Sequence, residues 1–182
     1  QVIYRNGAKE TDLVCVSGNL GAAYMGLQLL EREKSVFMGE SDAQPDFSGK
    51  EYLLERQLKP EARRDIIKAL DAAGITPTAM MDISDGIASD INHIMELSKV
   101  GARIELNNIP TDYDIRYATT GGEDYELLLT IEPGSFNAIA QALYDATGTT
   151  LTAIGTITDT ETLAWLDNGV HSDIEIRGFE HF

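Results

Sequence analysis

Cysteine and positive charge are both scarce in this sequence. Cys15 is the single cysteine, which excludes an internal disulfide and fits a reducing, cytoplasmic setting. Lysine and arginine together number 14 against 30 acidic residues, and the formal net charge is -16. Nucleic acids and anionic membrane surfaces bind to basic faces, so neither is expected as a partner. The acidity itself has two interpretations, which are simple solubility and a subset of carboxylates that collects divalent cations.

Long apolar runs and histidine clusters are missing as well. No run approaches the roughly 20 residues that cross a bilayer, and the sequence starts without a signal-peptide pattern. His93, His171 and His181 have no zinc-ligand spacing, and we expect His93 at the surface of a helix. Cys15 stands inside an apolar run at residues 13–16, so we expect a buried thiol there and no cysteine nucleophile.

Strand-like and helix-like segments follow one another irregularly along the 182 residues. Apolar or alternating runs predict strands at residues 13–17, 80–83, 102–106, 125–131 and 152–157, then a hairpin that turns at 167–169 and returns through Ile174 and Ile176. Helical spacing predicts helices at residues 22–33, 51–58, 60–74, 86–98 and 133–147, with a loop at 109–120. Without an internal repeat, this order predicts one α+β domain with a mixed β-sheet flanked by helices.

The segment Asp82-Ile83-Ser84-Asp85-Gly86 stands at a predicted junction between a strand and a helix. Alternation along the strand sends Asp82 and Ser84 to the same side, and Asp85 then begins the helix. Carboxylates are ligands that Mg²⁺ prefers, and a helix N-terminus favours phosphate oxygens. The segment therefore offers metal ligands and a phosphate-facing hydroxyl. The alternative is that Ser84 or Asp85 simply caps the helix.

Two further segments combine glycine with polar residues. Gly121-Gly122-Glu123-Asp124-Tyr125-Glu126 places three carboxylates directly before a predicted strand, as either a ligand-facing strand end or an ordinary acidic turn. Ser17-Gly18-Asn19-Leu20-Gly21 stands between a strand and a helix and has only the outline of a phosphate-binding loop. It lacks the Lys-Ser/Thr ending of a P-loop, and a plain tight turn is the alternative.

In chain order, these motifs resemble the thiamine-monophosphate kinase family. That family uses ATP and belongs to the superfamily of aminoimidazole ribonucleotide synthetase and selenophosphate synthetase. The resemblance covers nearly the whole chain, and the two acidic motifs are specific in combination. The matching stretches are residues 4–9 (YRNGAK), 16–23 (VSGNLGAA), 58–60 (LKP), 81–86 (MDISDG), 121–128 (GGEDYELL), 154–155 (IG) and 178–182 (GFEHF).

The resemblance implies a fold like the carboxy-terminal domain of aminoimidazole ribonucleotide synthetase. It also implies direct transfer of the ATP γ-phosphoryl group to thiamine monophosphate, assisted by Mg²⁺, with thiamine diphosphate as product and no covalent phospho-enzyme. No side chain is assigned a catalytic role. The implied metal ligands are Asp82 and Asp85. The implied ATP contacts are Arg5 and Ser84, and the implied substrate contacts are Glu123 and Phe179.

The sequence also departs from the family pattern. Family members carry an amino-terminal domain, rich in further metal-binding aspartates, that the 182 residues do not contain. We therefore expect residues 1–182 to form a carboxy-terminal domain that is inactive alone, and the full-length protein to be a homodimer. The stretch at 109–120 is shorter than the family leads us to expect, and Ala22 stands where relatives often carry an acidic residue.

Three other interpretations stay open. The first is a sister ATP-dependent enzyme of the same superfamily, against which the ending around Phe179 argues. The second is a non-catalytic module that binds divalent cations or a nucleotide. The third is a structural acidic domain in which the motifs act only as caps and turns. If Asp82 and Glu123 lay far apart on opposite faces, a shared site would be excluded.

Overall fold

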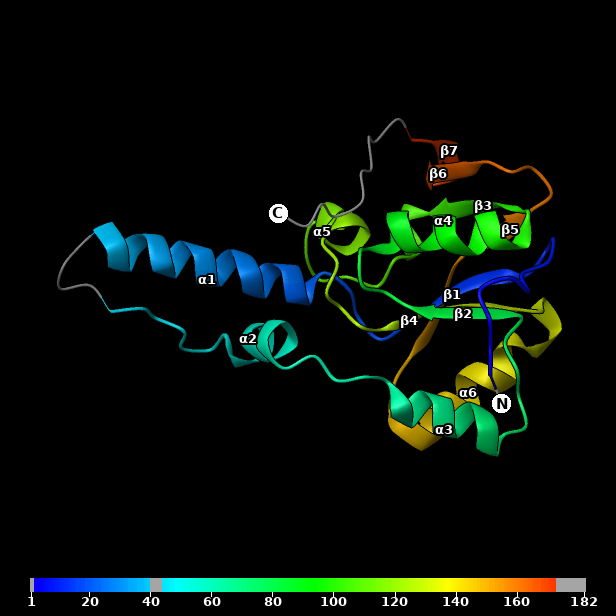
Figure 1. Ribbon diagram of the computed structural model, residues 1–182, viewed down its shortest axis with the longest axis horizontal. Coiled ribbons are helices and arrows are strands. Elements are labelled where there is room, and N and C mark those ends of the chain that lie inside the picture. The colour runs from blue at the N-terminus through cyan, green and yellow to red at the C-terminus, as the bar shows by residue number, and fades with distance from the viewer. Residues whose placement is uncertain (1, 40–43, 173–182) are drawn as a thin grey trace.

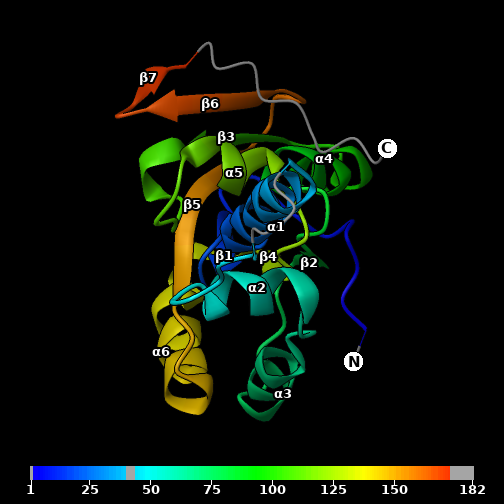
Figure 2. The ribbon, with the colours of Figure 1, turned by 90° about the vertical axis from the view of Figure 1, so that its left-hand side faces the viewer.

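The computed structural model describes residues 2–39 and 44–172 of the chain. Within these residues, a seven-stranded sheet has the strand order β2-β4-β1-β5-β3-β6-β7 (Figures 1 and 2). The strands are β1 (Leu13–Ser17), β2 (Ala79–Asp82), β3 (Gly101–Glu105), β4 (Leu127–Ile131), β5 (Leu151–Thr158), β6 (Leu163–Asp167) and β7 (Val170–His171). The α-helices are α1 (Ala22–Gly39), α2 (Glu51–Leu58), α3 (Arg64–Ala72), α4 (Ile87–Ser98), α5 (Ile115–Thr120) and α6 (Phe136–Thr147).

The sheet is mixed, as the sequence predicts. Strands β3 and β6 are parallel, and every other neighbouring pair is antiparallel. The alternation of side chains along β1 shows why both faces need cover. Val14 and Val16 point to one face and Cys15 to the other, and all three are fully buried. Helices therefore pack on both faces of this strand.

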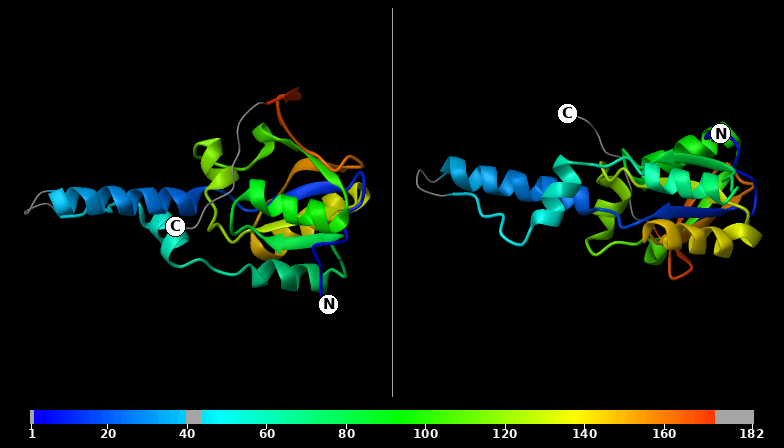
Figure 3. Two further views of the ribbon diagram at one scale, coloured as in Figure 1. Left: turned by 45° about the horizontal axis from the view of Figure 1, so that its top comes forward. Right: turned by 90° about the horizontal axis from the view of Figure 1, so that it is seen from below.

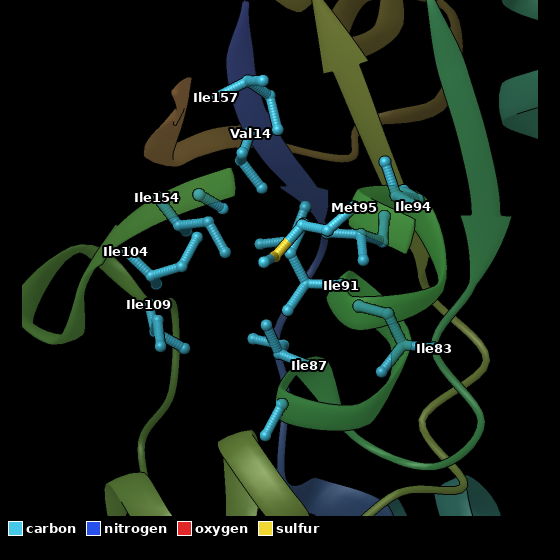
Figure 4. Packing of buried hydrophobic residues seen from close by; sticks show 14 of the residues in the cluster. Val14, Ile83, Ile87, Ile91, Ile94, Met95, Ile104, Ile109, Ile154 and Ile157 are labelled. Atoms are coloured by element: carbon cyan, nitrogen blue, oxygen red, sulfur yellow. The ribbon is translucent and has the colours of Figure 1, made fainter. Parts of the chain in front are cut away.

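The first face carries α4 and α5, and its core is rich in isoleucine (Figure 4). Helix α4 buries a stripe of side chains at helical spacing, as predicted, against residues of β1, β3 and β5. The second face carries α3 and α6, which pack against each other and against Cys15, Leu129 and Ile131. The stripe of α4 consists of Ile87, Ile91, Ile94 and Met95.

Helix α1 leaves the sheet and projects away from the body of the molecule, with α2 lying beside it (Figures 1 and 3). Gly26 permits this close packing, because a Cβ atom there would lie 2.2 Å from the carbonyl oxygen of Leu53. Helix α1 begins at the predicted residue but runs beyond the predicted end at residue 33.

Other predictions require correction. Helix α3 begins at Arg64, so Pro60 does not lie in its first turn. The side chain of Arg63, just before the helix, is held by Asp65 and Glu126, so tertiary contacts set this start. The predicted loop at 109–120 contains α5, whose N-terminus is capped by the Asp114 carboxylate. The predicted return of the last hairpin begins as β7, while Ile174 and Ile176 lie outside the described residues.

Among residues 2–39 and 44–172, no helix has both the length and the apolar character that crossing a bilayer requires.

Candidate active site

The two acidic motifs meet where β2 ends and β4 begins. The Ile83 N–H donates to the Glu126 carbonyl at 2.8 Å, and the Tyr125 N–H donates to the Ile83 carbonyl at 2.9 Å. The Glu123 N–H donates to the Ser84 carbonyl at 2.8 Å. These bonds continue the antiparallel β2–β4 pairing into the loops beyond both strands. The predicted convergence of the motifs is therefore confirmed.

The loop between β2 and α4 is held from behind by a carboxylate of the helix. Asp90 Oδ2 accepts hydrogen bonds from the Ser84 N–H at 3.1 Å and the Asp85 N–H at 3.2 Å. Asp90 itself is buried. The Ser84 hydroxyl donates to Asp85 Oδ1 at 3.2 Å. With its backbone fixed from the inside, the loop keeps Asp82 exposed and both Ser84 and Asp85 partly exposed.

Gly86 begins helix α4 in place of the predicted caps. Its φ of 95° is unfavourable for residues other than glycine, and a Cβ atom there would lie 2.6 Å from the Thr119 carbonyl oxygen. The N-cap is Gly86, without a side-chain capping bond. The alternative in which Ser84 or Asp85 caps α4 is therefore wrong. Asp90, which sequence reasoning missed, lies in the first turn of the helix and accepts the backbone hydrogen bonds that hold the loop.

The pKa of Asp90 is raised to about 7. Burial is the main cause, since a low-dielectric surrounding disfavours the charged carboxylate, and the nearby Asp85 and Asp82 raise the pKa further. Hydrogen bonds from the Ser84 and Asp85 backbone act in the opposite direction. Asp85 and Asp82 therefore bring negative charge close to the buried carboxyl of Asp90.

The three carboxylates of the second motif divide into two groups. Asp124 and Glu126 are buried and point into the protein. Glu123 is only partly buried, and its Oε2 accepts a hydrogen bond of 3.3 Å from the Tyr125 hydroxyl. Both Glu123 and Tyr125 have positive φ angles, 62° and 51°, which are uncommon for residues other than glycine. Of the three carboxylates, Glu123 is therefore the one available to a ligand.

The Tyr125 hydroxyl lies near three of the predicted ligand-binding residues, which are Glu123, Asp82 and Asp85. The pKa of its hydroxyl is raised by burial first, then by the carboxylate of Glu123 and by those of Asp82 and Asp85. The hydroxyl thus lies near carboxylates of both motifs. Sequence reasoning missed Tyr125, because its backbone, like that of Glu123, has a positive φ and does not follow the alternation of an extended strand.

The glycine turn at residues 17–21 is structural. The Gly18 and Leu20 N–H groups donate to the carbonyls of Thr150 and Pro110. Asp124 accepts from the Gly21 N–H at 2.8 Å and, in the first turn of α1, from the Ala23 N–H at 3.5 Å. Asp124 thereby supplies a carboxylate at the start of α1, where a phosphate-binding loop would bind phosphate. Burial raises the pKa of Asp124 to about 6. Of the two interpretations, the tight turn is the one that fits.

Glu126 joins the same structural group. It accepts from the Ser17 hydroxyl at 2.6 Å and pairs with Arg56 at 3.1 Å and Arg63 at 2.8 Å. The two arginines line a polar cavity of about 570 Å³ together with Glu126 and Thr149. Since the guanidinium groups are already paired with carboxylates, including Asp124 and Asp65, the cavity has no excess of positive charge.

Arg5 and Asp82 line one open pocket of about 500 Å³. The chain before β1 lies against the outer edge of β2, where the Met80 N–H donates to the Tyr4 carbonyl at 3.1 Å. The Ser98 hydroxyl donates to the Arg5 carbonyl at 3.1 Å and so fixes this segment on α4. The exposed guanidinium of Arg5 thus belongs to the same side of the molecule as Asp82. Phe179, the remaining predicted contact, lies outside the described residues.

The donor set suits a hard divalent cation. Asp82 and Asp85 offer carboxylate oxygens that solvent reaches, and oxygen ligands of this kind suit such a cation. Within the part of the chain that the structure describes, one group of three residues brings potential metal ligands together, and these are Asp85, Asp90 and His93. Asp82 is outside this group.

The chain is similar to known proteins along most of its length. The family model for AIR synthase related protein, C-terminal domain, matches residues 9–166. The thiamine-monophosphate kinase of Escherichia coli is 32% identical over 193 residues, covering 100% of this chain and 56% of that protein. The chain thus spans about half the length of the curated relatives it matches.

Solved structures are similar to this chain as well. The thiamine-monophosphate kinase of Stenotrophomonas maltophilia has a TM-score of 0.74 and 27% identity, covering 94% of this chain and 54% of that one. AaThiL, complexed with AMPPCP and TMP, has a TM-score of 0.73 and 31% identity, covering 99% of this chain and 54% of that one. From the match over residues 9–166 and these relatives, the chain belongs to the AIR synthase related C-terminal domain family, where it is similar to thiamine-monophosphate kinases.

Proposed function

We propose that the protein containing this chain transfers the γ-phosphoryl group of ATP to thiamine monophosphate and forms thiamine diphosphate. The observation that carries the proposal is the meeting of the two acidic motifs, in which Glu123 and Ser84 are joined by a backbone hydrogen bond of 2.8 Å. Support comes from the relatives, which are named thiamine-monophosphate kinases, and from AaThiL, complexed with AMPPCP and TMP.

The chemistry fits a site without a catalytic acid or base. The attacking atom is a phosphate oxygen of thiamine monophosphate, which is already anionic, so no side chain needs to remove a proton from it. The main task is to bring two polyanions together in line and to neutralise their charge. Asp82 and Asp85 would hold Mg²⁺, which when bound supplies that neutralisation. The guanidinium of Arg5 would contact the ATP phosphates, and the Ser84 hydroxyl would donate a hydrogen bond to ATP.

The acceptor substrate is recognised on the other motif. Its thiazolium ring is cationic, which suits the carboxylate of Glu123, and the Tyr125 hydroxyl holds that carboxylate at 3.3 Å. Phe179 would stack on the ring system of the substrate. Asp90 positions Ser84 and Asp85 through their backbone N–H groups and does not itself contact the substrate in this proposal.

We also propose that residues 1–182 act as a carboxy-terminal domain, which needs the other half found in its relatives to complete the nucleotide site. The relatives are about twice as long, since the aligned region covers 56% of the Escherichia coli protein. The homodimer expected for the full-length protein is likewise a proposal, which light scattering on that protein tests directly.

The deciding experiment measures ADP formation from ATP, Mg²⁺ and thiamine monophosphate. It compares the 182-residue chain with a version extended by any upstream coding region. We expect activity in the extended protein and its loss with Asp82→Asn. Asp159→Asn, an exposed aspartate beyond β5, is the matched control and should keep full activity.

An extended, folded protein without activity on thiamine monophosphate would contradict the proposal. Activity with another oxygen or selenium acceptor would then identify a sister enzyme of the superfamily. Nucleotide binding without turnover would instead identify a binding module.

A further inference from the structure

Arg56 of α2 extends from the projecting pair of helices into the second acidic motif. Its Nη2 donates to the main-chain carbonyl of Asp124 at 2.9 Å and to that of Asn19 at 3.4 Å. Its Nη1 donates to the Glu126 carboxylate at 3.1 Å. The Arg56 side chain is 19% exposed, so these contacts are largely shielded from solvent. One guanidinium group therefore holds the main chain of the motif as well as neutralising its charge.

The contact at the Asp124 carbonyl fixes the peptide unit that joins Asp124 to Tyr125. The carbonyl end of this unit accepts from Arg56. Its N–H end, which belongs to Tyr125, donates to the Ile83 carbonyl at 2.9 Å. Because a peptide unit is planar, two bonds at its opposite ends together restrict its rotation. The backbone dihedral angles that flank the unit, at Asp124 and Tyr125, are restricted with it.

This peptide unit lies in a strained stretch of main chain. Glu123 and Tyr125, on either side of Asp124, have φ angles of 62° and 51°. Residues other than glycine adopt such angles at a cost in free energy, and they keep them only where the surrounding contacts impose them. The Arg56 bond is one of these contacts, and the bond from the Glu123 N–H to the Ser84 carbonyl is another. Without the Arg56 bond, the segment should relax and move the Glu123 carboxylate.

A second arginine beside Glu126 has different partners. Arg63 Nη1 donates to both carboxylate oxygens of Glu126, at 3.0 Å and 2.8 Å. The Arg63 Nε and Nη2 atoms donate to the Asp65 carboxylate at 3.1 Å and 2.9 Å. These partners are side chains, so the two arginines share the charge of Glu126, whereas the bond to the Asp124 carbonyl comes from Arg56.

We propose that Arg56 is a positioning residue for the acceptor substrate. It holds the peptide unit between Asp124 and Tyr125 and thereby sets the direction in which the Glu123 carboxylate points. The inference rests on the proposed function, in which Glu123 binds thiamine monophosphate, and deepens it by giving a residue of α2 a part in acceptor recognition. Arg56 does not contact the substrate in this proposal. Its loss should therefore weaken acceptor binding without slowing phosphoryl transfer between bound substrates.

The first test measures amide hydrogen exchange by NMR in the ligand-free 182-residue chain. It compares Arg56→Lys with the matched control Arg63→Lys. Both variants keep their positive charge, but a lysine ammonium lacks the planar fork that serves a carboxylate and a carbonyl together. We expect the Glu123 and Tyr125 amides to exchange at least about tenfold faster in Arg56→Lys, because a hydrogen bond from a charged group is lost. Amides at the centre of β4 report global opening and correct for differences in overall stability.

The second test measures steady-state kinetics in the extended, active protein. In Arg56→Lys, we expect KM for thiamine monophosphate to rise at least about tenfold. The kcat value and KM for ATP should stay unchanged, because the proposed ATP contacts are Arg5 and Ser84. Arg63→Lys should change none of these constants. A merely structural role for Arg56 would instead reduce the amount of folded enzyme, which lowers the apparent kcat and leaves KM as it is.

Equal exchange of the Glu123 and Tyr125 amides in Arg56→Lys and Arg63→Lys would overturn the inference. A fall in kcat with KM for thiamine monophosphate unchanged would also overturn it. If Arg56→Lys does not fold, Arg56→Gln, which keeps a donor without the charge, is compared with Arg63→Gln in the same way. An extended wild-type protein that forms no ADP with thiamine monophosphate would contradict the kinase proposal, and the exchange measurement would still decide whether Arg56 holds Glu123.

Discussion

Two loops of this chain join a strand to a helix through glycine, and a carboxylate holds each of them differently. At the start of α1, Asp124 comes from a distant loop and accepts from the N–H groups of Gly21 and Ala23. At the start of α4, Asp90 comes from the helix itself and accepts from the N–H groups of Ser84 and Asp85. Asp124 lies where a phosphate-binding loop would bind phosphate. Asp90 holds its loop from the inside, so that the side chains of the loop face outward. Similar sequence patterns thus form one structural turn and one ligand-facing loop.

The second motif repeats this division within four residues. Asp124 and Glu126 are each 2% exposed and belong to the structural turn, whereas Glu123 and Tyr125 face the ligand side. If the division is real, substitutions on the structural side should cost stability, and those on the ligand side should cost activity. The following predictions test it, from the largest expected effect to the smallest.

Glu126→Gln should have the largest effect on stability. It removes the buried carboxylate that the half-buried Arg56 and Arg63 contact at 3.1 Å and 2.8 Å, and it leaves them only the carboxylates of Asp124 and Asp65. We expect the free energy of unfolding in urea to fall by about 3–5 kcal/mol. Glu123→Gln, the matched change on the ligand side, should stay within about 0.5 kcal/mol of the wild type. Equal losses in the two variants would contradict the division.

Asp124 predicts a pH dependence of stability. Its pKa rises from the usual 3.8 to about 6 in the folded chain, so the folded state binds the proton more tightly than the unfolded state. The resulting stabilisation is complete below pH 3.8 and is lost as the pH rises through about 6. The slope is at most about 1.4 kcal/mol per pH unit.

Urea unfolding between these pH values checks this prediction. The stability advantage of the wild type over Asp124→Asn should shrink as the pH rises and then level off. Asp159→Asn, on an exposed turn, is the control variant. A slope that survives unchanged in Asp124→Asn would assign the titration to another group.

Gly86→Ala should cost more stability than Gly74→Ala. Both glycines have positive φ, 95° and 68°, but a Cβ atom at Gly74 would meet nothing within 4 Å. Gly74→Ala should therefore cost only the conformational term of about 1–2 kcal/mol. Gly86→Ala adds a clash with the Thr119 carbonyl, which we expect to cost about 1–3 kcal/mol more. Thermal unfolding of the two variants gives the difference directly, and equal values would mean that the loop shifts freely.

Tyr125→Phe should have the smallest effect. It removes one hydrogen bond, of 3.3 Å, to Glu123, which corresponds to about 0.5–1.5 kcal/mol of binding. In the extended, active protein, we expect KM for thiamine monophosphate to rise severalfold with kcat preserved. Tyr144→Phe on exposed α6 is the control and should change neither constant. A fall in kcat alone would mean that Tyr125 acts on the transition state.

Much of the fold could be predicted from the sequence because its signals are local. The apolar runs of β1 and β4 and the helical stripe of α4 need no knowledge of the rest of the chain. Helix α5 escaped prediction because its six residues are too few for a periodic pattern. The start of α3 escaped because it depends on contacts between Arg63 and Glu126, 63 residues away.

The motif residues of the site could be predicted from the sequence, but the buried residue that holds their loop could not. Asp82, Ser84, Asp85 and Glu123 were found from motifs, and the structure brings them together; their roles as ligands remain predictions. Asp90 supports them through backbone bonds to residues five and six positions earlier, a spacing that no regular pattern signals. Burial separates Glu123 from Asp124 and Glu126, but the positive φ angles of Glu123 and Tyr125 show that the segment is not extended, so strand alternation does not account for this separation.

The single cysteine can report on the opening of the sheet. Cys15 is fully buried in β1, between β4 and β5, and burial raises the pKa of its thiol to about 12. A thiol reagent added to the native protein therefore reacts only when this strand becomes exposed. Because no second thiol competes, the rate of labelling measures how often the centre of the sheet opens, without any engineered probe.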